Sequence, residues 1–184
     1  ESALAILRGL DDPIRTAEAL NGLGIVMRNR GEVERAEPMH REALALLESV
    51  EGQRRHIAST LNNLGSLAYF RGDREQAGHY WDQALAIVQE LGDQRAALSV
   101  LGNLWALALM NQDIERAIAI DQEALTLARR LNDYSGVTRG LVNLGGALYE
   151  SGQHAESKPL FDEALSRARE SGDRFAESIV PYNL

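Results

Sequence analysis

One residue pattern returns along the chain every 40 or 41 positions. A step of 41 followed by two steps of 40 aligns a leucine column and an Ala-Leu column. The members are Leu23, Leu64, Leu104 and Leu144, and Ala43-Leu44, Ala84-Leu85, Ala124-Leu125 and Ala164-Leu165. A fixed period of this size is typical of repeat architectures, in which each unit buries its apolar face against neighbouring units. The sequence therefore predicts an array of repeats.

Each repeat contains two stretches with helical spacing of apolar residues, and no stretch alternates as a strand does. Glycines at 31, 72 and 152 mark a tight turn between the two stretches. The spacing predicts first helices over 13–29, 54–70, 94–110 and 134–150. Second helices are predicted over 32–50, 73–91, 113–131 and 153–171. Each repeat is thus expected to be a helical hairpin.

The expected organisation is a single array over residues 1–184. It comprises a half repeat over 1–11, repeats over 12–52, 53–92, 93–132 and 133–172, and a half repeat over 173–184. The repeat register runs through both ends, since Ala3-Leu4 precedes Ala43-Leu44 by one step and Asn183-Leu184 follows Asn143-Leu144 by one step. We therefore expect the chain to be a fragment of a larger protein.

Turn and cap residues support these boundaries. Asp12 precedes Pro13, a pairing suited to a helix start, and Asp93, Asp133 and Asp173 occupy the corresponding places. Asp73 and Gln76 have the spacing of a capping box, in which each side chain binds the other residue's backbone N–H.

Some residues depart from the pattern, and three of them bear on helix packing. Trp105 stands in a column that otherwise holds Gly24, Gly65 and Gly145. A tryptophan there costs about 1–3 kcal/mol if the geometry is unchanged, so the third repeat is expected to be splayed. Pro38 and Pro159 interrupt second helices, where each removes a backbone donor and is expected to bend the helix.

The columns resemble the tetratricopeptide repeat, a two-helix unit with a Leu-Gly step in its first helix. The best single stretch runs from Asn62 to Asp73 with the sequence NNLGSLAYFRGD. The period of about 40 is similar to the longer-helix branch found in kinesin light chains and bacterial signalling proteins. The resemblance implies an all-α, right-handed solenoid of antiparallel helix pairs whose first helices line a concave groove. It also implies a non-enzymatic scaffold that binds a peptide or an extended protein segment.

Candidate binding residues lie on the inward stripe of the first helices. Asn63, Asn103 and Asn143 form one column, and each amide can donate to and accept from a peptide backbone. This resembles the asparagine ladder with which such solenoids hold extended ligands. The alternative is that each asparagine binds a neighbouring helix.

The remaining candidates are basic, hydroxyl-bearing or apolar. Guanidinium groups suit carboxylates, so the arginines predict a partner with acidic residues. The alternative is that they pair with the chain's own acids. The aromatic residues and Met110 are expected to form an apolar strip, with Tyr149 the most exposed and some of the others packed between repeats. These residues are Arg55, Arg95, Arg139, Ser59, Ser66, Tyr69, Phe70, Met110 and Tyr149.

Composition excludes several classes of function. The chain has no cysteine and a formal net charge of −8, which argue against thiolate chemistry and against direct binding of nucleic acid. No apolar run is long enough to span a membrane, no basic signal region starts the chain, and a cytoplasmic setting is the default. The four histidines have no metal-binding spacing, and no cofactor motif is present. Lys158 is the only lysine, a bias towards arginine that suggests a bacterial source.

Two other functions stay open. The array is alternatively the effector-sensing or regulatory region of a bacterial ATPase or transcription regulator. It is also alternatively a self-assembly module, associating through its unfinished end helices.

Overall fold

The computed structural model describes residues 6, 9 and 11–172. Within this part of the chain there are eight α-helices and no strand. The first helices of the pairs are α2 (Pro13–Asn29), α4 (Arg54–Phe70), α6 (Gln94–Met110) and α8 (Tyr134–Glu150). The second helices are α3 (Val33–Glu48), α5 (Arg74–Glu90), α7 (Ile114–Arg130) and α9 (His154–Ser171).

The predicted helices are confirmed. All four first helices have the predicted bounds. Each second helix begins one residue later than predicted. α3, α5 and α7 end one or two residues earlier than predicted, and α9 ends at the predicted residue. The half repeats predicted at 1–11 and 173–184 lie almost wholly outside the described residues. The same is true of the cap predicted at Asp173.

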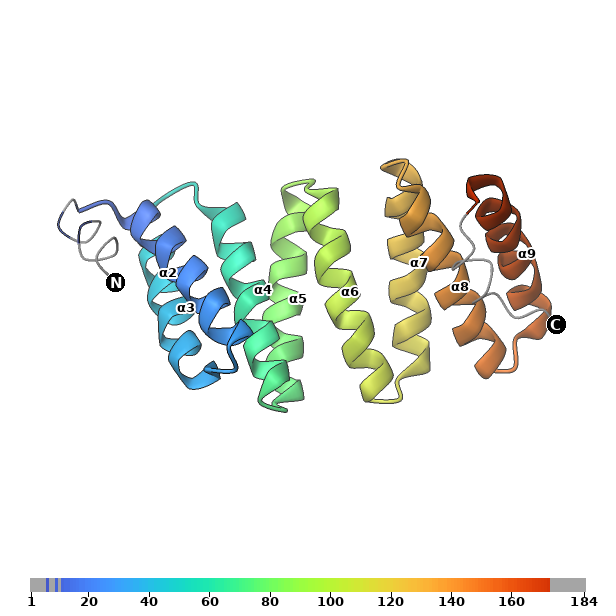
Figure 1. The fold of residues 1–184 in the computed structure, drawn as a ribbon, viewed down its shortest axis with the longest axis horizontal. Helices are drawn as coiled ribbons and strands as arrows, with labels where there is room; N and C mark the ends of the chain where they lie inside the picture. Colours follow the sequence, from blue (N-terminus) through green and yellow to red (C-terminus); the bar gives the residue numbers. More distant parts are fainter. Residues whose placement is uncertain (1–5, 7–8, 10, 173–184) are drawn as a thin grey trace. The chain divides into compact units, whose positions relative to one another are not determined.

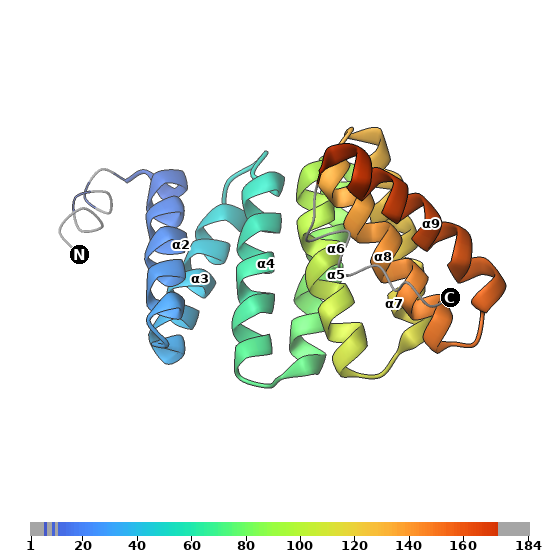
Figure 2. The same cartoon turned by 45° about the vertical axis from the view of Figure 1, so that its right-hand side comes forward.

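The chain divides into two compact units, with the boundary inside α6 between Val100 and Leu101. In the first unit α2 packs against α3, α3 against α4, and α4 against α5 (Figure 1). The first helices α2 and α4 also contact each other directly, and Figure 2 shows them side by side. In the second unit α8 packs against both α7 and α9. Within each unit the helices are therefore arranged as successive antiparallel pairs.

Aspartates begin most of the helices, as predicted. The Asp12 carboxylate accepts from the Arg15 backbone N–H at 3.0 Å, and Asp93 and Asp133 make the equivalent bonds at the starts of α6 and α8. Asp73 accepts from the Gln76 backbone N–H at 3.1 Å, which is one half of the predicted capping box. The other half is absent, because the Gln76 side chain binds Arg71 instead.

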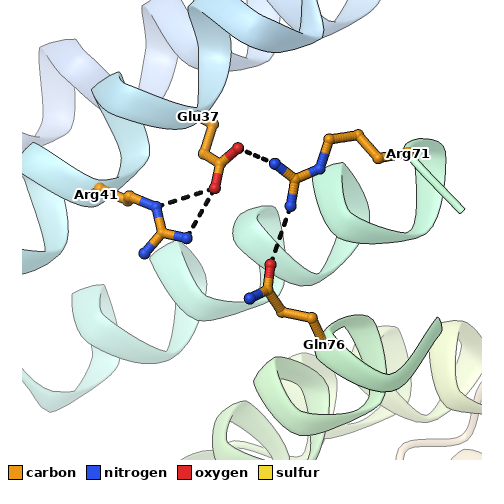
Figure 3. A network of polar contacts seen from close by, with 4 residues as sticks. All are labelled: Glu37, Arg41, Arg71 and Gln76. Carbon is orange, nitrogen blue, oxygen red and sulfur yellow. Dashed lines mark hydrogen bonds and ion pairs between the residues drawn. The ribbon is translucent and has the colours of Figure 1, made fainter. Parts of the chain in front are cut away.

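Arg71 is the C-cap residue directly after α4, and it joins two successive repeats (Figure 3). It donates to the Glu37 carboxylate of α3 and to Oε1 of Gln76, the latter at 3.0 Å. Glu37 also accepts two bonds from Arg41, at 2.8 and 3.0 Å. Because the Glu37 side chain is largely shielded from water, its charged bonds are screened less than those of a surface pair. The network thus fastens α3 to the turn between α4 and α5.

Both prolines lie within helices that continue through them. Pro38 is the sixth residue of α3, and Pro159 is the sixth residue of α9. Both rings are exposed to solvent. The lost backbone bond therefore falls near the start of each helix and away from the core.

Each hairpin is closed by a contact between two residues sixteen positions apart. Gly65 of α4 faces the Trp81 ring of α5, and a Cβ atom at Gly65 would lie 2.6 Å from that ring. Gly24 faces His40 in the same way, with a corresponding distance of 2.5 Å, and Gly145 faces Phe161 at 3.0 Å. The glycine is therefore required at these places because a ring from the second helix occupies the space of a side chain.

The third repeat reverses this arrangement. Trp105 of α6 supplies the large side chain, and the residue sixteen positions later is Asp121 of α7. The Trp105 indole Nε1–H donates to Oδ2 of Asp121 at 2.8 Å. The hydrogen bond thus holds α6 and α7 together at this level, and the smaller Asp121 leaves room for Trp105. The expectation of a splayed third repeat did not take this smaller partner into account.

Replacing Gly65 with alanine tests the close approach. We expect Gly65→Ala to lower the free energy of unfolding by about 1–3 kcal/mol, because the new methyl group overlaps the Trp81 ring. The matched control is Gly22→Ala on α2, where no atom lies within 4 Å of the new Cβ. That variant should gain about 0.5–1 kcal/mol from helix propensity. Urea denaturation measures both, and equal effects of the two substitutions would contradict the account.

His40 makes stability depend on pH. Its ring is 1% exposed, Nδ1 lies 2.7 Å from Oδ1 of Asn21, and Nε2 has no hydrogen-bond partner among the residues that the structure describes. Burial, together with the positive charge of Arg28, lowers the pKa of His40 from 6.5 to about 4. The unfolded chain therefore binds a proton more readily than the folded chain, and stability falls as the pH falls from about 6.5 towards 4.

We expect His40→Phe to remove this loss, which amounts to about 3 kcal/mol at most. His79→Phe is the control, because His79 is exposed on α5, and it should follow the unmodified chain. Denaturation at a series of pH values measures the effect. Parallel stability curves for the unmodified chain and His40→Phe would show that this ring does not cause the loss.

Candidate functional site

The face of α4 that is turned away from the core forms one accessible stripe. Buried residues, among them Leu61, Leu64 and Leu67, hold the opposite face of the helix. The stripe has spacings of three and four residues, so its side chains lie along one side. We call it the α4 stripe: Arg55, Ser59, Asn63, Ser66 and Phe70. Its two ends are exposed, and Asn63 and Ser66 are half-buried.

The corresponding face of α8 is also accessible. We call it the α8 stripe: Ser135, Arg139, Asn143, Gly146 and Tyr149. On α6, Arg95 belongs to the first unit, whereas Asn103 and Met110 belong to the second. Arg95 and Met110 are exposed, and Asn103 is half-buried. The predicted residues are thus brought together along single helices, within each unit.

The three candidate arginines are all exposed but differ in their partners. Arg55 Nε lies 3.3 Å from Oδ2 of Asp93, so the alternative of pairing with the chain's own acids holds for this residue. Neither Arg95 nor Arg139 takes part in an ion pair with a residue that the structure describes. These two guanidinium groups are the ones available to a carboxylate from outside.

The candidate aromatic residues fall into two groups. Tyr149 is 45% exposed, as expected, but Phe70 is more exposed at 68%. Tyr69 is half-buried, and its ring centroid lies 5.7 Å from that of Trp81. Phe70 and Tyr149 therefore offer apolar surface, whereas Tyr69 contributes to packing.

The asparagine column is not uniform. The Asn143 side chain makes a hydrogen bond with Asp121 of α7, as the alternative reading of this column predicted for a neighbouring helix. Asn63 faces a different environment. Asp121 belongs to the repeat before Asn143, and the equivalent residue in the repeat before Asn63 is His40 of α3.

Two buried polar groups beneath the first helices escaped the sequence analysis. Burial raises the pKa of Asp121 to about 7, and hydrogen bonds with Trp105 and Asn143 lower it by less. Under α2, Asn21 binds His40 and also donates to Oγ1 of Thr60 at 2.7 Å. Comparing the glycine column with the residues sixteen positions later would have revealed both groups, since His40 and Asp121 alternate there with Trp81 and Phe161.

The described residues show neither a metal site nor a membrane span. No group of three or more acidic or histidine side chains lies close enough together in this part of the chain to hold a metal ion. None of its helices is both long and apolar enough to cross a membrane.

Several solved structures share this fold. BtubC (BKLC) from P. vanneervenii is 22% identical, with a TM-score of 0.82 over 94% of this chain and 71% of that chain. A signal-transduction ATPase with a tetratricopeptide repeat sensor from Pyrococcus horikoshii is 20% identical, with a TM-score of 0.72 over 90% of this chain and 25% of the ATPase. The Rap conjugation gene regulator of plasmid pLS20, in complex with the Phr* peptide, is 17% identical, with a TM-score of 0.67 over 96% of this chain and 48% of the regulator.

The chain thus spans a quarter of the ATPase and about half of the Rap regulator. A comparison with curated proteins finds no match. Two family models described as tetratricopeptide repeats match the sequence, one over residues 56–130 and the other over 16–58 and 139–171. This fold is generally an interaction scaffold without catalytic activity. The helix pairs, the repeat columns and these matches together show that the chain belongs to the tetratricopeptide repeat family.

Proposed function

We propose that the chain is a protein-interaction scaffold, not an enzyme, and that it binds a peptide or an extended protein segment along its first helices. The observation that carries the proposal is the repeated stripe. α4 and α8 both leave uncovered a face with an arginine near the helix start, an asparagine at the middle and an aromatic side chain at the end. Such a linear arrangement suits an extended ligand. The arginine offers charge, the asparagine offers hydrogen bonds to the ligand backbone, and the aromatic side chain offers apolar contact.

The charges favour a ligand with acidic residues. Arg139 stands on the α8 stripe and Arg95 at the start of α6, both exposed and outside the described ion pairs. The chain as a whole carries a formal net charge of −8, so an acidic ligand is repelled by most of the surface. Within each unit, such an arginine on a first helix would therefore orient a ligand as well as hold it.

The similar structures support a peptide ligand. The Rap regulator is described in complex with the Phr* peptide. This supports binding of a peptide by repeats of this fold and leaves the sequence of the ligand for this chain open.

Selection from a random peptide library, followed by affinity measurements with fluorescein-labelled peptides, tests the proposal. We expect the selected peptides to be rich in Asp and Glu. The double variant Arg95→Glu/Arg139→Glu should bind them about tenfold more weakly, because an attractive contact in each unit becomes repulsive.

The control is the double variant Arg35→Glu/Arg129→Glu. It changes the net charge equally but alters second helices, where Arg35 pairs with Glu32 and Arg129 with Glu163. It should retain the affinity of the unmodified chain. A library that yields no binding peptide, or equal losses in the two double variants, would contradict the proposal.

A regulatory role is the second candidate. The signal-transduction ATPase with a tetratricopeptide repeat sensor has the same fold, and the Rap protein is a conjugation gene regulator. In such a role the stripes would receive an effector and pass its binding to neighbouring domains. Peptide binding alone fits both roles. A regulatory role also requires that the selected peptide changes the activity of a domain joined to the repeats, and measuring that change separates the two.

A further inference from the structure

A buried carboxyl group lies directly beneath the α8 stripe. Asp121 of α7 is 4% exposed. Its Oδ2 accepts from the Trp105 indole at 2.8 Å, and its carboxyl group also makes the hydrogen bond with the Asn143 side chain. The bond with Asn143 lowers the pKa of Asp121, as expected when an amide N–H donates to a carboxylate. Asp121 therefore connects the half-buried Trp105 to an asparagine of the proposed binding face.

No other repeat has an acid at this position. The equivalent residues are His40, Trp81 and Phe161. The residue that stands to Asn63 as Asp121 stands to Asn143 is His40 of α3, whose Nδ1 lies 2.7 Å from Oδ1 of Asn21. Asn63 therefore has no carboxyl group from this position to orient its amide. Asn143 is thus a member of the asparagine column whose side chain is held by a buried acid beneath it.

We propose that Asp121 is a positioning residue that sets which end of the Asn143 amide the α8 stripe presents to a ligand. When the carboxyl group is ionised, it holds the Asn143 NH₂ group, and Oδ1 is left to accept from a ligand N–H. When the carboxyl group is protonated, its O–H donates to Asn143 Oδ1, and the NH₂ group is left to donate to a ligand carbonyl. The inference rests on the proposed function, since it concerns binding at the same surface.

Both forms of Asp121 are present near neutral pH. Burial raises its pKa to about 7. Among the described residues, the groups acting on this carboxyl are the Trp105 indole of α6 and the Asn143 amide of α8, and neither of them titrates in this range. The orientation of the Asn143 amide is therefore expected to follow the protonation of one neighbouring group.

Nuclear magnetic resonance of the side-chain amides tests the coupling without a ligand. In the full chain, the Asn143 NH₂ signals should shift with a midpoint near pH 7, and those of Asn63 should not shift there. The shift should vanish in Asp121→Asn, which keeps an oxygen for the Trp105 indole. It should persist in the control Asp162→Asn, which removes an exposed acid of α9. Asn143 signals that do not shift around pH 7, or that still shift in Asp121→Asn, would overturn the proposal.

Peptide binding tests the consequence. Histidine-free peptides selected on the unmodified chain at about pH 8.5 should bind about two- to tenfold more weakly at about pH 5.5, the effect of one hydrogen bond. Asp121→Asn should show no such change. Asn143→Ala should also show none, although it leaves Asp121 in place, which separates positioning from a purely structural role of the acid. A pH dependence that survives in either variant would overturn the inference.

The two proposals fail in different ways. If no peptide binds, the proposed function fails, and the amide signals still decide whether Asp121 controls Asn143. If peptides bind with the expected dependence on Arg95 and Arg139 but the Asn143 signals ignore pH, the function stands and the positioning role is wrong.

Discussion

The fit of one large side chain against one small residue across each hairpin is the contact on which the repeats depend. Gly24, Gly65 and Gly145 each admit a ring from the second helix, sixteen residues later. The ring fills the gap between the two helices, where dispersion contacts are lost if either partner changes size. Because this contact lies on the inner face of each first helix, the outer face of that helix is left without a partner inside the hairpin. The accessible stripes of α4 and α8 are therefore a consequence of how the hairpins close.

The third repeat shows that the constraint concerns the pair and not either residue. Trp105 and Asp121 exchange the large and small places, and the indole N–H compensates the buried carboxyl with a hydrogen bond. This exchange puts an ionisable group in the core beneath Asn143. Asp121 thus links the packing of the third repeat to the proposed binding surface. A repeat with an aromatic ring at that position has no such link.

The repeats and helix bounds could be predicted from the sequence because both depend on local, repeated signals such as helical spacing, Asp caps and turn glycines. The side-chain partners could not be predicted in the same way. Trp105 was expected to disturb the packing because its column was considered without the column sixteen residues later, which holds the smaller Asp121 in this repeat. Arg55 and Arg139 looked alike in sequence, yet within the described part of the chain only Arg55 forms an ion pair, with the capping Asp93. The binding role of the exposed candidates stays a prediction, because exposure follows from packing whereas affinity depends on a ligand.

A double-mutant cycle on Trp105 and Asp121 tests the central claim most directly. Trp105→Gly leaves a cavity and Asp121→Phe overfills the hairpin, whereas the double variant recreates the Gly145–Phe161 pair of the fourth repeat. The account predicts that each single variant unfolds at lower urea concentration and that the double variant recovers stability, with a coupling free energy of about 1–3 kcal/mol. Losses that simply add in the double variant would show that the two residues do not form a size-matched pair.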